Sequence, residues 1–318
     1  MNLSGSKVNN VKQIYDMIVI GGGPGGYTAA LYAARAGMSV VVLEKLSAGG
    51  QMALTEQIDN YPGFVYGVDG FTLGENMQLQ AERFGVKTEL ADVFSVELDG
   101  NVKEITTSDG VYYGKTVVFA TGANPRKLGL EHEAEFVGRG VNYCAACDGM
   151  FYKDKTVVVI GGGNSAAADA LLLSKIAKKV ILVHRRDTLR ATKIYHEPLL
   201  NAENVEFRWN TVVTELLHNG NKINGVNVKH LVTEDVSVAE CDGVFISIGR
   251  IPATELVRDK LELTEDGYIS ADESTKTNIP GVFAVGDVRT KALRQIVTAV
   301  ADGAVAAFFA EEYLAGIK

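Results

Sequence analysis

Two cysteines separated by two small residues are the clearest chemical feature of the sequence. Cys144 and Cys147 bracket two alanines, and Asp148 follows the second cysteine directly. Thiols at this spacing can close into a disulfide and reopen, and the adjacent carboxyl group can carry the proton that this exchange requires. The stretch therefore predicts a redox couple with its own acid–base group.

A glycine-rich turn near the N-terminus predicts the elements that would deliver electrons to this couple. Residues 16–20 have the pattern of a buried parallel strand, 27–36 that of an alanine-rich helix, and 39–43 that of a second strand ending at Glu44. Strand, glycine turn, helix, strand and acid in this order are typical of a dinucleotide-binding unit. We expect the Glu44 carboxylate to accept a hydrogen bond from a ribose 2′-hydroxyl.

Each glycine of the turn has a separate role in this interpretation. Gly21 allows the tight turn, Gly23 lets the backbone approach a pyrophosphate, and Gly26 lets helix and strand pack closely. The N-terminus of the helix then offers free N–H groups to a phosphate. A glycine-rich turn alone is weak evidence, and the two strands and the acid are what favour the nucleotide interpretation.

The same pattern occurs a second time. Residues 156–160 form another predicted strand, which is followed by a glycine turn at Gly161, a helix through about residue 177 and a strand over 179–183. Gly21 and Glu44 are 23 residues apart, and so are Gly161 and His184. The repeat predicts a second nucleotide-binding unit.

Basic residues replace the ribose acid in this second unit. His184 is followed by Arg185 and Arg186, and Arg190 lies four residues further on. Guanidinium groups pair with a 2′-phosphate that a carboxylate would repel, so the first unit suits a free ribose and the second suits NADPH. The alternative is a solvated basic start of a helix.

The pieces between and after the repeats fit a flavin. Two loops, 49–51 and 58–63, fall inside the first unit, where the alternative is that they are turns only. A predicted strand over 281–286 leads to Asp287, which could bind a sugar or could be an ordinary helix cap. Arg294 and Gln295 then open an apolar helix, whose N-terminus would stabilise negative charge on a reduced flavin.

The remaining segments give the order of the domains. Residues 71–84 are predicted to be helical, 88–108 to be a β meander, and 115–123 to be a strand that runs into a glycine turn. Glycine and proline break regular structure near Asn124-Pro125 and again at 249–252, which predicts two crossings between domains. The second nucleotide unit is therefore expected to be inserted into the first, an α/β fold with two Rossmann-like, three-layer nucleotide-binding domains.

Composition limits the class of protein. The chain has 318 residues, enough for two domains, and a net charge of −8, which disfavours nucleic acid or an anionic membrane as a partner. It has three cysteines, no apolar run of membrane-spanning length and a polar start, so we expect a cytoplasmic protein in which the cysteine pair is catalytic. Cys241 is expected to be a packed thiol, and the histidines show no metal-binding spacing.

Taken together, these motifs resemble the low-molecular-weight, bacterial-type thioredoxin reductases of the pyridine nucleotide-disulfide oxidoreductase family. The resemblance runs from about Tyr15 to the C-terminus and rests on GGGPGG, GGQM, DNYPGF, ATGA, CAACDG, GGGNSA, HRRDTLR, GRIP, GVFAVGD and RQIVTA, in this order. It implies a homodimeric flavoprotein that reduces thioredoxin with NADPH. The first residues, 1–12, are expected to be a flexible arm. The two crossings and the motifs predict an FAD domain over 13–122 and 253–318 and an NADPH domain over 123–252 that carries the disulfide.

The resemblance also assigns residues to cofactors. FAD would be held by Gly21, Gly23, Pro24, Gly26, Glu44, Gly50, Gln51, Asn60, Thr121, Gly122, Gly286, Asp287, Arg294, Gln295 and Ile296. NADPH would be held by Gly163, Asn164, Ser165, His184, Arg185, Arg186, Arg190 and Gly249.

The implied mechanism passes a hydride from NADPH to the flavin and then reduces the disulfide. Cys147 would face the flavin, Cys144 would attack thioredoxin, and Asp148 would be the general acid and base. Because the disulfide and the NADPH motif share one inserted domain and both need the same flavin, that domain is expected to rotate between half-reactions.

Two departures from the family pattern and two rival functions stay open. Ala166-Ala167-Ala168-Asp169 stands where many relatives carry further acidic residues, and Leu293 stands where they carry an aromatic residue. The rivals are a dithiol oxidase of the same architecture and a flavoprotein that reduces a peroxiredoxin. Outside enzymes, a redox-sensing interaction protein is the alternative.

Overall fold

The computed structural model describes residues 13–55 and 57–317, which form two compact units. Unit 1 contains the chain up to Asn124 and again from Pro252 onward, and unit 2 is Pro125–Ile251. Unit 2 is thus inserted in the sequence of unit 1. The arm predicted for residues 1–12 lies outside the described residues.

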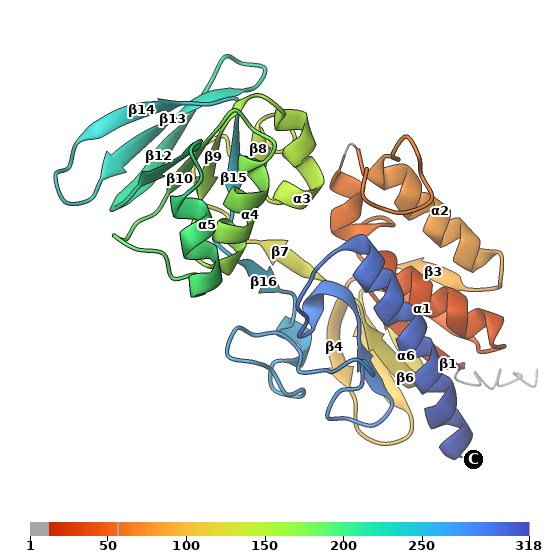
Figure 1. Ribbon diagram of the computed structural model, residues 1–318. Helices are drawn as coiled ribbons and strands as arrows, with labels where there is room; N and C mark the ends of the chain where they lie inside the picture. Colours follow the sequence, from red (N-terminus) through yellow and green to blue (C-terminus); the bar gives the residue numbers. More distant parts are fainter. Residues whose placement is uncertain (1–12, 56, 318) are drawn as a thin grey trace, which may run out of the picture. The chain divides into compact units, whose positions relative to one another are not determined.

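Unit 1 is built on a seven-stranded sheet with the order β3-β2-β1-β6-β5-β4, in which β17 also pairs with β6 (Figure 1). Its strands are β1 (Ile14–Ile20), β2 (Val40–Glu44), β3 (Lys87–Leu90), β4 (Val93–Glu97), β5 (Lys103–Thr107), β6 (Gly110–Phe119) and β17 (Val282–Ala284). Its helices are α1 (Pro24–Arg35), α2 (Gly70–Glu82) and α6 (Ile296–Gly316), with short 3-10 turns η1 (Gly50–Leu54), η4 (Glu255–Val257) and η5 (Gly286–Val288).

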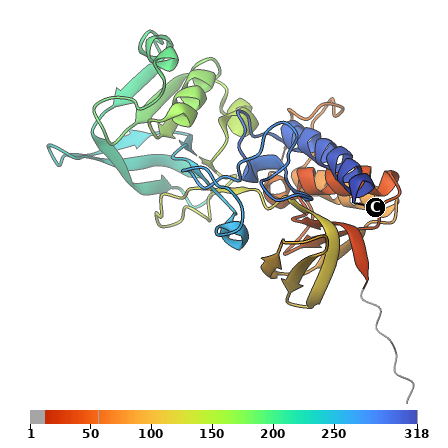
Figure 2. The same cartoon turned by 90° about the horizontal axis from the view of Figure 1, so that it is seen from below.

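The strand β1 is apolar throughout its buried part because both of its faces are covered. Met17 and Val19 pack with α1 and α6, whereas Ile18 and Ile20 pack with residues of the β4–β5 region and of the C-terminal loops. Helix α6 runs alongside α1 (Figures 1 and 2). The two helices approach closely at Gly303, where a Cβ would lie 2.4 Å from the Gly25 carbonyl oxygen.

Unit 2 contains a five-stranded parallel sheet, a three-stranded antiparallel sheet and three helices. The parallel sheet has the order β11-β10-β9-β15-β8, and the antiparallel one the order β12-β13-β14. The bounds are β8 (Val141–Asn142), β9 (Thr156–Ile160), β10 (Lys179–Val183), β11 (Val205–Arg208), β12 (Thr211–His218), β13 (Ile223–His230), β14 (Val236–Glu240), β15 (Gly243–Ile246), α3 (Ala145–Asp148), α4 (Asn164–Ser174), α5 (His196–Leu200), η2 (Gly149–Tyr152) and η3 (Lys193–Tyr195).

The central strand β9 shows why this unit has three layers. Val157 and Val159 pack with the helix α4, while Val158 and Ile160 pack with the antiparallel sheet. Alternate side chains of a strand point to opposite faces, so a continuous apolar run is buried on both sides.

Two short strands, β7 (Ala123–Pro125) and β16 (Arg250–Pro252), pair with each other where the chain enters and leaves the unit.

Several predicted bounds were wrong. The helix α1 begins at Pro24 rather than at residue 27, because proline fits the first turn, where its missing N–H costs no hydrogen bond. The predicted meander over 88–108 begins later than expected: β3 pairs in parallel with β2, and only β4, β5 and the first half of β6 are antiparallel. The helix α4 ends at Ser174 rather than near residue 177.

The strand β6 begins at Gly110, earlier than predicted, and ends at Phe119, just before the predicted glycine turn, where Gly122 has a φ of +72°. Its first half pairs with β5, and its second half lies between β1 and β17. The two sets of partners extend one strand over ten residues. Within the described residues, no helix is long and apolar enough to cross a membrane.

Candidate active site

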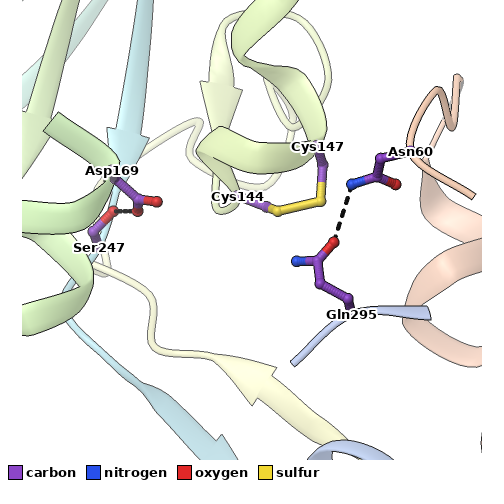
Figure 3. The surroundings of a disulfide bond; sticks show 6 residues. All are labelled: Asn60, Cys144, Cys147, Asp169, Ser247 and Gln295. Carbon is purple, nitrogen blue, oxygen red and sulfur yellow. Dashed lines mark hydrogen bonds between the residues drawn. A yellow bond between two sulfur atoms is a disulfide. The ribbon is translucent and has the colours of Figure 1, made fainter. Parts of the chain in front are cut away.

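Cys144 and Cys147 form a disulfide in unit 2, with their Cα atoms 5.3 Å apart (Figure 3). Cys144 is the N-cap of the one-turn helix α3, and its carbonyl oxygen accepts the N–H groups of Cys147 at 3.2 Å and Asp148 at 3.0 Å. Ala145 is buried, which explains why a small residue follows Cys144. Residues 144–148, which we call the redox turn, therefore present both sulfur atoms and one carboxyl group on a single turn.

Asp148 has the protonation behaviour that acid–base work near neutral pH requires. Burial raises the pKa of its carboxyl group to about 6, because the charged form loses hydration. A carboxyl group with this pKa exchanges its proton close to neutral pH. The free thiol of Cys241 differs: it is buried, and burial together with the neighbouring Asp242 raises its pKa to about 12, which leaves it unreactive.

The first glycine turn, in unit 1, has the close contacts that its glycines predict. Gly21 has a φ of +104°, and its N–H donates to the Leu43 carbonyl oxygen at 2.9 Å. A Cβ on Gly26 would lie 2.0 Å from the Gly21 carbonyl oxygen, whereas a Cβ on Gly23 would meet nothing within 4 Å. Gly23 thus leaves an open approach to the backbone, as a bound pyrophosphate needs. Glu44 accepts the Gly22 N–H at 2.6 Å, so its carboxylate is held against this turn.

The second glycine turn, in unit 2, repeats this arrangement with a histidine. The Gly161 N–H donates to the Val183 carbonyl oxygen at 3.1 Å, and Gly163 is open in the way that Gly23 is. The His184 ring lies against Gly162, where a Cβ would come within 2.2 Å of the ring. The Arg190 N–H donates to the Gly162 carbonyl oxygen at 2.7 Å, which brings the following loop back to the turn.

The basic residues beside this turn lie on a loop and not on a helix. His184 directly follows β10 and is buried, while Arg185, Arg186 and Arg190 are exposed on a loop. Burial, and then the charges of the three arginines, lower the pKa of His184, so the ring is neutral at pH 7. Its Nε2 atom has no hydrogen-bond partner among the described residues. A helix start, the alternative interpretation of this basic segment, is wrong because residues 184–190 are not helical.

The other predicted NADPH residues surround this turn. Gly163 caps α4, and Asn164 and Ser165 form its exposed first turn. The Asn164 Oδ1 atom accepts the Thr192 N–H at 2.8 Å. Gly249 lies just before β16, two residues after Ser247, whose backbone carbonyl lies against Gly161, and the Gly249 carbonyl oxygen accepts the Arg126 N–H.

Polar side chains from distant parts of unit 1 meet at the predicted flavin residues. The Asn60 Nδ2 atom donates to Gln295 Oε1 at 3.0 Å across 235 residues of sequence (Figure 3). Gln295 is the N-cap of α6, which begins at Ile296, and it forms a capping box with Thr298. Both loops that the sequence left as possible turns therefore take part in longer-range contacts, since Gln51 also donates to Asn124 at 2.9 Å.

The remaining predicted flavin residues lie at strand ends and helix starts of the same unit. Thr121 and Gly122 follow β6, and Thr121 donates to the Ala253 carbonyl oxygen at 2.7 Å. Gly286 and Asp287 form η5 directly after β17. The Arg294 guanidinium group lies 4.0 Å above the Tyr268 ring. Gly50 begins η1, and Pro24 begins α1.

Sequence reasoning missed three side chains: two next to the redox turn and one that contacts Gly286. Glu133 and Tyr143 hydrogen-bond each other just before Cys144, and Asp302 accepts the Gly286 N–H at 2.8 Å. The direct adjacency of Tyr143 to Cys144 was the only signal available for the first pair. The Asp302 contact joins two elements and has no local signature.

Comparisons with known proteins agree with this site. A sequence profile described as pyridine nucleotide-disulphide oxidoreductase matches residues 15–303. The chain is 44% identical over 309 residues to the thioredoxin reductase of Peptoclostridium litorale, covering 96% of this chain and 98% of that one.

Solved structures show the same similarity. The crystal structure of thioredoxin reductase from Streptococcus pyogenes MGAS5005 is 44% identical, with a TM-score of 0.88 over 95% of this chain and 99% of that one. The thioredoxin reductase from Giardia duodenalis is 32% identical, with a TM-score of 0.89 over 96% of this chain and 100% of that one. The profile match, the full-length identity and the disulfide on its acid-bearing turn lead to one conclusion: the chain belongs to the pyridine nucleotide-disulphide oxidoreductase family, among its low-molecular-weight thioredoxin reductases.

Proposed function

We propose that this protein is an FAD-containing, NADPH-dependent thioredoxin-disulfide reductase of the cytoplasm. The observation that carries the proposal is the Cys144–Cys147 disulfide, followed by Asp148 and placed in the same unit as an arginine-flanked glycine turn. The overall reaction oxidises one NADPH and reduces one disulfide of thioredoxin, with two electrons and two protons reaching the two product thiols.

The residues of unit 1 fit a flavin dinucleotide. Gly23 leaves room for a pyrophosphate, Glu44 is oriented at the turn, and Asn60 with Gln295 forms a polar pair at the start of α6. We propose that FAD is held by the residues assigned above from Gly21 to Glu44, by Gly50, Gln51, Asn60, Thr121 and Gly122, and by the segments 286–287 and 294–296. When bound, FAD supplies a two-electron carrier between a nicotinamide and a disulfide.

The residues of unit 2 fit NADPH. The open backbone at Gly163 suits a pyrophosphate, and three exposed arginines suit a 2′-phosphate, which guanidinium groups bind bidentately. The His184 ring is neutral, and its Nε2 atom has no hydrogen-bond partner among the described residues, so it can donate a hydrogen bond to an oxygen of the same ligand. We therefore propose that Gly163, Asn164, Ser165, His184, Arg185, Arg186, Arg190 and Gly249 hold NADPH.

The redox turn carries the thiol chemistry of the protein itself. We propose that two electrons supplied by NADPH break the Cys144–Cys147 bond, which leaves both sulfurs as thiolates, and that Asp148 protonates the Cys147 thiolate from the same turn. The Cys144 thiolate then attacks one sulfur of thioredoxin, forming a mixed disulfide and releasing the other sulfur as a thiol once it takes a proton. Asp148 then takes the proton back from Cys147, whose thiolate attacks the Cys144 sulfur of the mixed disulfide. The Cys144–Cys147 bond forms again, and the second thioredoxin sulfur leaves and takes a proton.

Two further parts of the proposal rest on connectivity and on family membership. The redox turn and the second glycine turn both lie in unit 2, while the proposed flavin residues lie in unit 1. We propose that unit 2 rotates about the β7–β16 crossings so that each can serve the flavin in turn. We also propose a homodimer, as the family implies.

One set of measurements tests the function. The purified protein is expected to be yellow, to lose its flavin absorbance on anaerobic mixing with NADPH, and to reduce thioredoxin catalytically. Cys144→Ser is the matched control, because it should keep the NADPH-dependent bleaching and lose thioredoxin reduction.

Three outcomes would contradict the proposal. Equal rates with NADH would reject the NADPH site, and thioredoxin left oxidised would reject the substrate. Oxygen-dependent oxidation of a small dithiol in place of thioredoxin reduction would favour a dithiol oxidase.

A further inference from the structure

Both neighbours of Cys144 in the chain lie beside a carboxylate. On one side, the Tyr143 hydroxyl donates to Glu133 Oε1 at 2.7 Å. On the other, α3 packs against α4, and the Ala145 backbone N–H lies near enough to the Asp169 carboxylate to offset part of the rise that burial causes in its pKa. We call Glu133 and Asp169 the carboxylate clamp. All of these residues belong to unit 2.

Glu133 is itself fixed. Its side chain is 3% exposed, and besides the Tyr143 hydroxyl it accepts the backbone N–H groups of Leu128 at 3.0 Å, Gly129 at 2.7 Å and Leu130 at 3.3 Å. A buried carboxylate with four donors has no alternative position of similar energy. The Tyr143 ring is thereby held at a fixed point next to the first cysteine.

Asp169 is fixed from the other side. It lies on α4 and accepts the Ser247 hydroxyl at 2.5 Å (Figure 3). The positive charge of Arg250, at the start of β16, also acts on it. Ser247 is buried directly after β15, and its own N–H donates to the Ile160 carbonyl oxygen at 2.8 Å. The contact thus connects the redox turn to the ends of the two central strands.

We propose that Glu133 and Asp169 are positioning residues that hold Tyr143 and Ala145 in the conformation that closes the Cys144–Cys147 disulfide, and that they thereby set the reduction potential of this couple. The proposal rests on the proposed function in that it treats this disulfide as the redox couple. This proposal also gives a role to one residue of the segment 166–169, which departs from the family pattern. Its first three positions are alanines, but the fourth, Asp169, keeps a carboxylate that can act on the redox turn.

The physical reason is effective concentration. Two thiols held in the geometry of the bond lose little freedom when the bond forms, so the disulfide is favoured over the dithiol. The clamp contacts are present with the disulfide closed. Removing one of them loosens the turn and shifts the equilibrium toward the dithiol.

The measurement is the equilibrium of the disulfide with dithiothreitol in the flavin-loaded protein under anaerobic conditions. In this exchange the Cys144–Cys147 bond breaks, each sulfur takes one proton, and dithiothreitol is oxidised to its cyclic disulfide. The samples are quenched with acid and alkylated, and the dithiol fraction of the peptide that carries both cysteines is measured by mass spectrometry.

The variants are Tyr143→Phe, which removes one hydroxyl and keeps the ring, and Asp169→Asn, which removes the charge at constant size. Each is expected to raise the equilibrium constant for reduction by about three- to tenfold, where tenfold corresponds to about 30 mV for a two-electron couple. Tyr195→Phe and Asp154→Asn are the matched controls in the same unit, and neither is expected to change the constant. Ser247→Ala is the second variant for the Asp169 contact, should Asp169→Asn fail to fold.

A purely structural role gives a different result. Replacing a residue that only stabilises the fold lowers the melting temperatures of the oxidised and reduced forms equally. The equilibrium of the disulfide with dithiothreitol then stays unchanged. An unchanged equilibrium constant in Tyr143→Phe and also in Asp169→Asn, or in Ser247→Ala where that variant replaces it, would overturn the proposal. The assay needs neither NADPH nor thioredoxin, so it can fail while the proposed function stands.

Discussion

Glu44 and His184 occupy the same position in two copies of one structural unit. Glu44 ends β2 and His184 directly follows β10, and in each copy the carbonyl oxygen of the preceding residue accepts the N–H of the first glycine of the turn, from Gly21 in one copy and Gly161 in the other. Each side chain also lies against the second glycine of its turn. One position thus carries a negative charge in unit 1 and a neutral ring beside three arginines in unit 2.

The arginines beside His184 are expected to select the nucleotide. Replacing Arg185 and Arg186 together by alanine removes two charged hydrogen-bonding groups, each contributing about 1.5 kcal/mol or more. The KM for NADPH should therefore rise about 100-fold, since each 1.4 kcal/mol is a factor of about ten. Steady-state kinetics with thioredoxin as the acceptor would measure this.

NADH provides the comparison for this prediction. It lacks the 2′-phosphate, so its KM should hardly change in the double variant. Lys222→Ala removes a positive charge from an exposed turn of the same unit and should alter neither value. An equal rise of both KM values would mean that the arginines do not read the phosphate.

Trp209 is expected to report nucleotide binding. It is the only tryptophan in the chain, it stacks on Phe207, and its ring centroid lies 6.4 Å from that of His184. A nucleotide that contacts the His184 ring changes the surroundings of the indole. Titration with NADP⁺, which does not reduce the flavin, should give a saturable change in tryptophan emission, with a midpoint about 100-fold higher in the double arginine variant. A flat titration at saturating NADP⁺ would contradict this placement.

Asp148→Asn is expected to lower activity and raise stability. Loss of a general acid and base typically costs at least about 100-fold in rate. The raised pKa means that the folded protein binds this proton more tightly than the unfolded chain does, so the parent loses stability as the pH rises from 3.8 through about 6. Asparagine cannot ionise, and the variant should therefore melt higher than the parent at pH 7, with a smaller difference at pH 4.

Thermal unfolding at the two pH values and single-turnover disulfide reduction would test both parts. The parent rate should fall above an apparent pKa near 6, and this dependence should be absent in the variant. Asp154→Asn, on an exposed turn of the same unit, should leave rate and stability unchanged. A variant that melts lower than the parent at pH 7 would show that the Asp148 carboxylate is not destabilised by burial.

Asp302→Ala is expected to destabilise unit 1 strongly. Asp302 is buried on α6 and pairs at 3.0 Å with Arg289, which is also buried, and at 2.6 Å with Lys291, which is half-buried. Removing the anion leaves the buried Arg289 cation without its charged partner, which costs about 3–5 kcal/mol. It also frees the Gly286 N–H, next to the proposed flavin contact at Asp287.

The temperature at which flavin is released during thermal unfolding would measure this loss of stability. Release is expected at a clearly lower temperature in Asp302→Ala, and Asp302→Asn is available if the alanine variant does not fold. Glu311→Gln removes an exposed carboxylate from the same helix and should behave like the parent. Release at the parent temperature in both Asp302 variants would contradict the stabilising role.

The sequence predicted the fold well where one segment determines its own structure. The strands at 156–160 and 179–183 agree with β9 and β10 to the residue, because apolar runs ending in glycine or polar residues have few alternatives. The assignment of faces was not predictable in this way. In β9, Val157 faces a helix and Val158 faces a second sheet, and all of the side chains are apolar.

Contacts between distant segments were also beyond the sequence. The motif containing Asn60 and the one containing Gln295 were both identified, but the hydrogen bond between them spans 235 residues. Pairing of β3 with β2 rather than with its neighbour β4 depends on the whole sheet. Asp169 was interpreted as part of a departure from the family pattern, since nothing in its local sequence indicates the contact with the redox turn.

The pairing of β7 with β16 has a consequence for engineering and for evolution. The segment Pro125–Ile251 leaves and rejoins the rest of the chain at adjacent points, where Arg126 also hydrogen-bonds Gly249 at 2.9 Å. A cassette whose two ends meet can be exchanged without stretching its host. Replacing this cassette by one from a relative with a different nucleotide preference or thiol substrate would transfer both properties in a single graft.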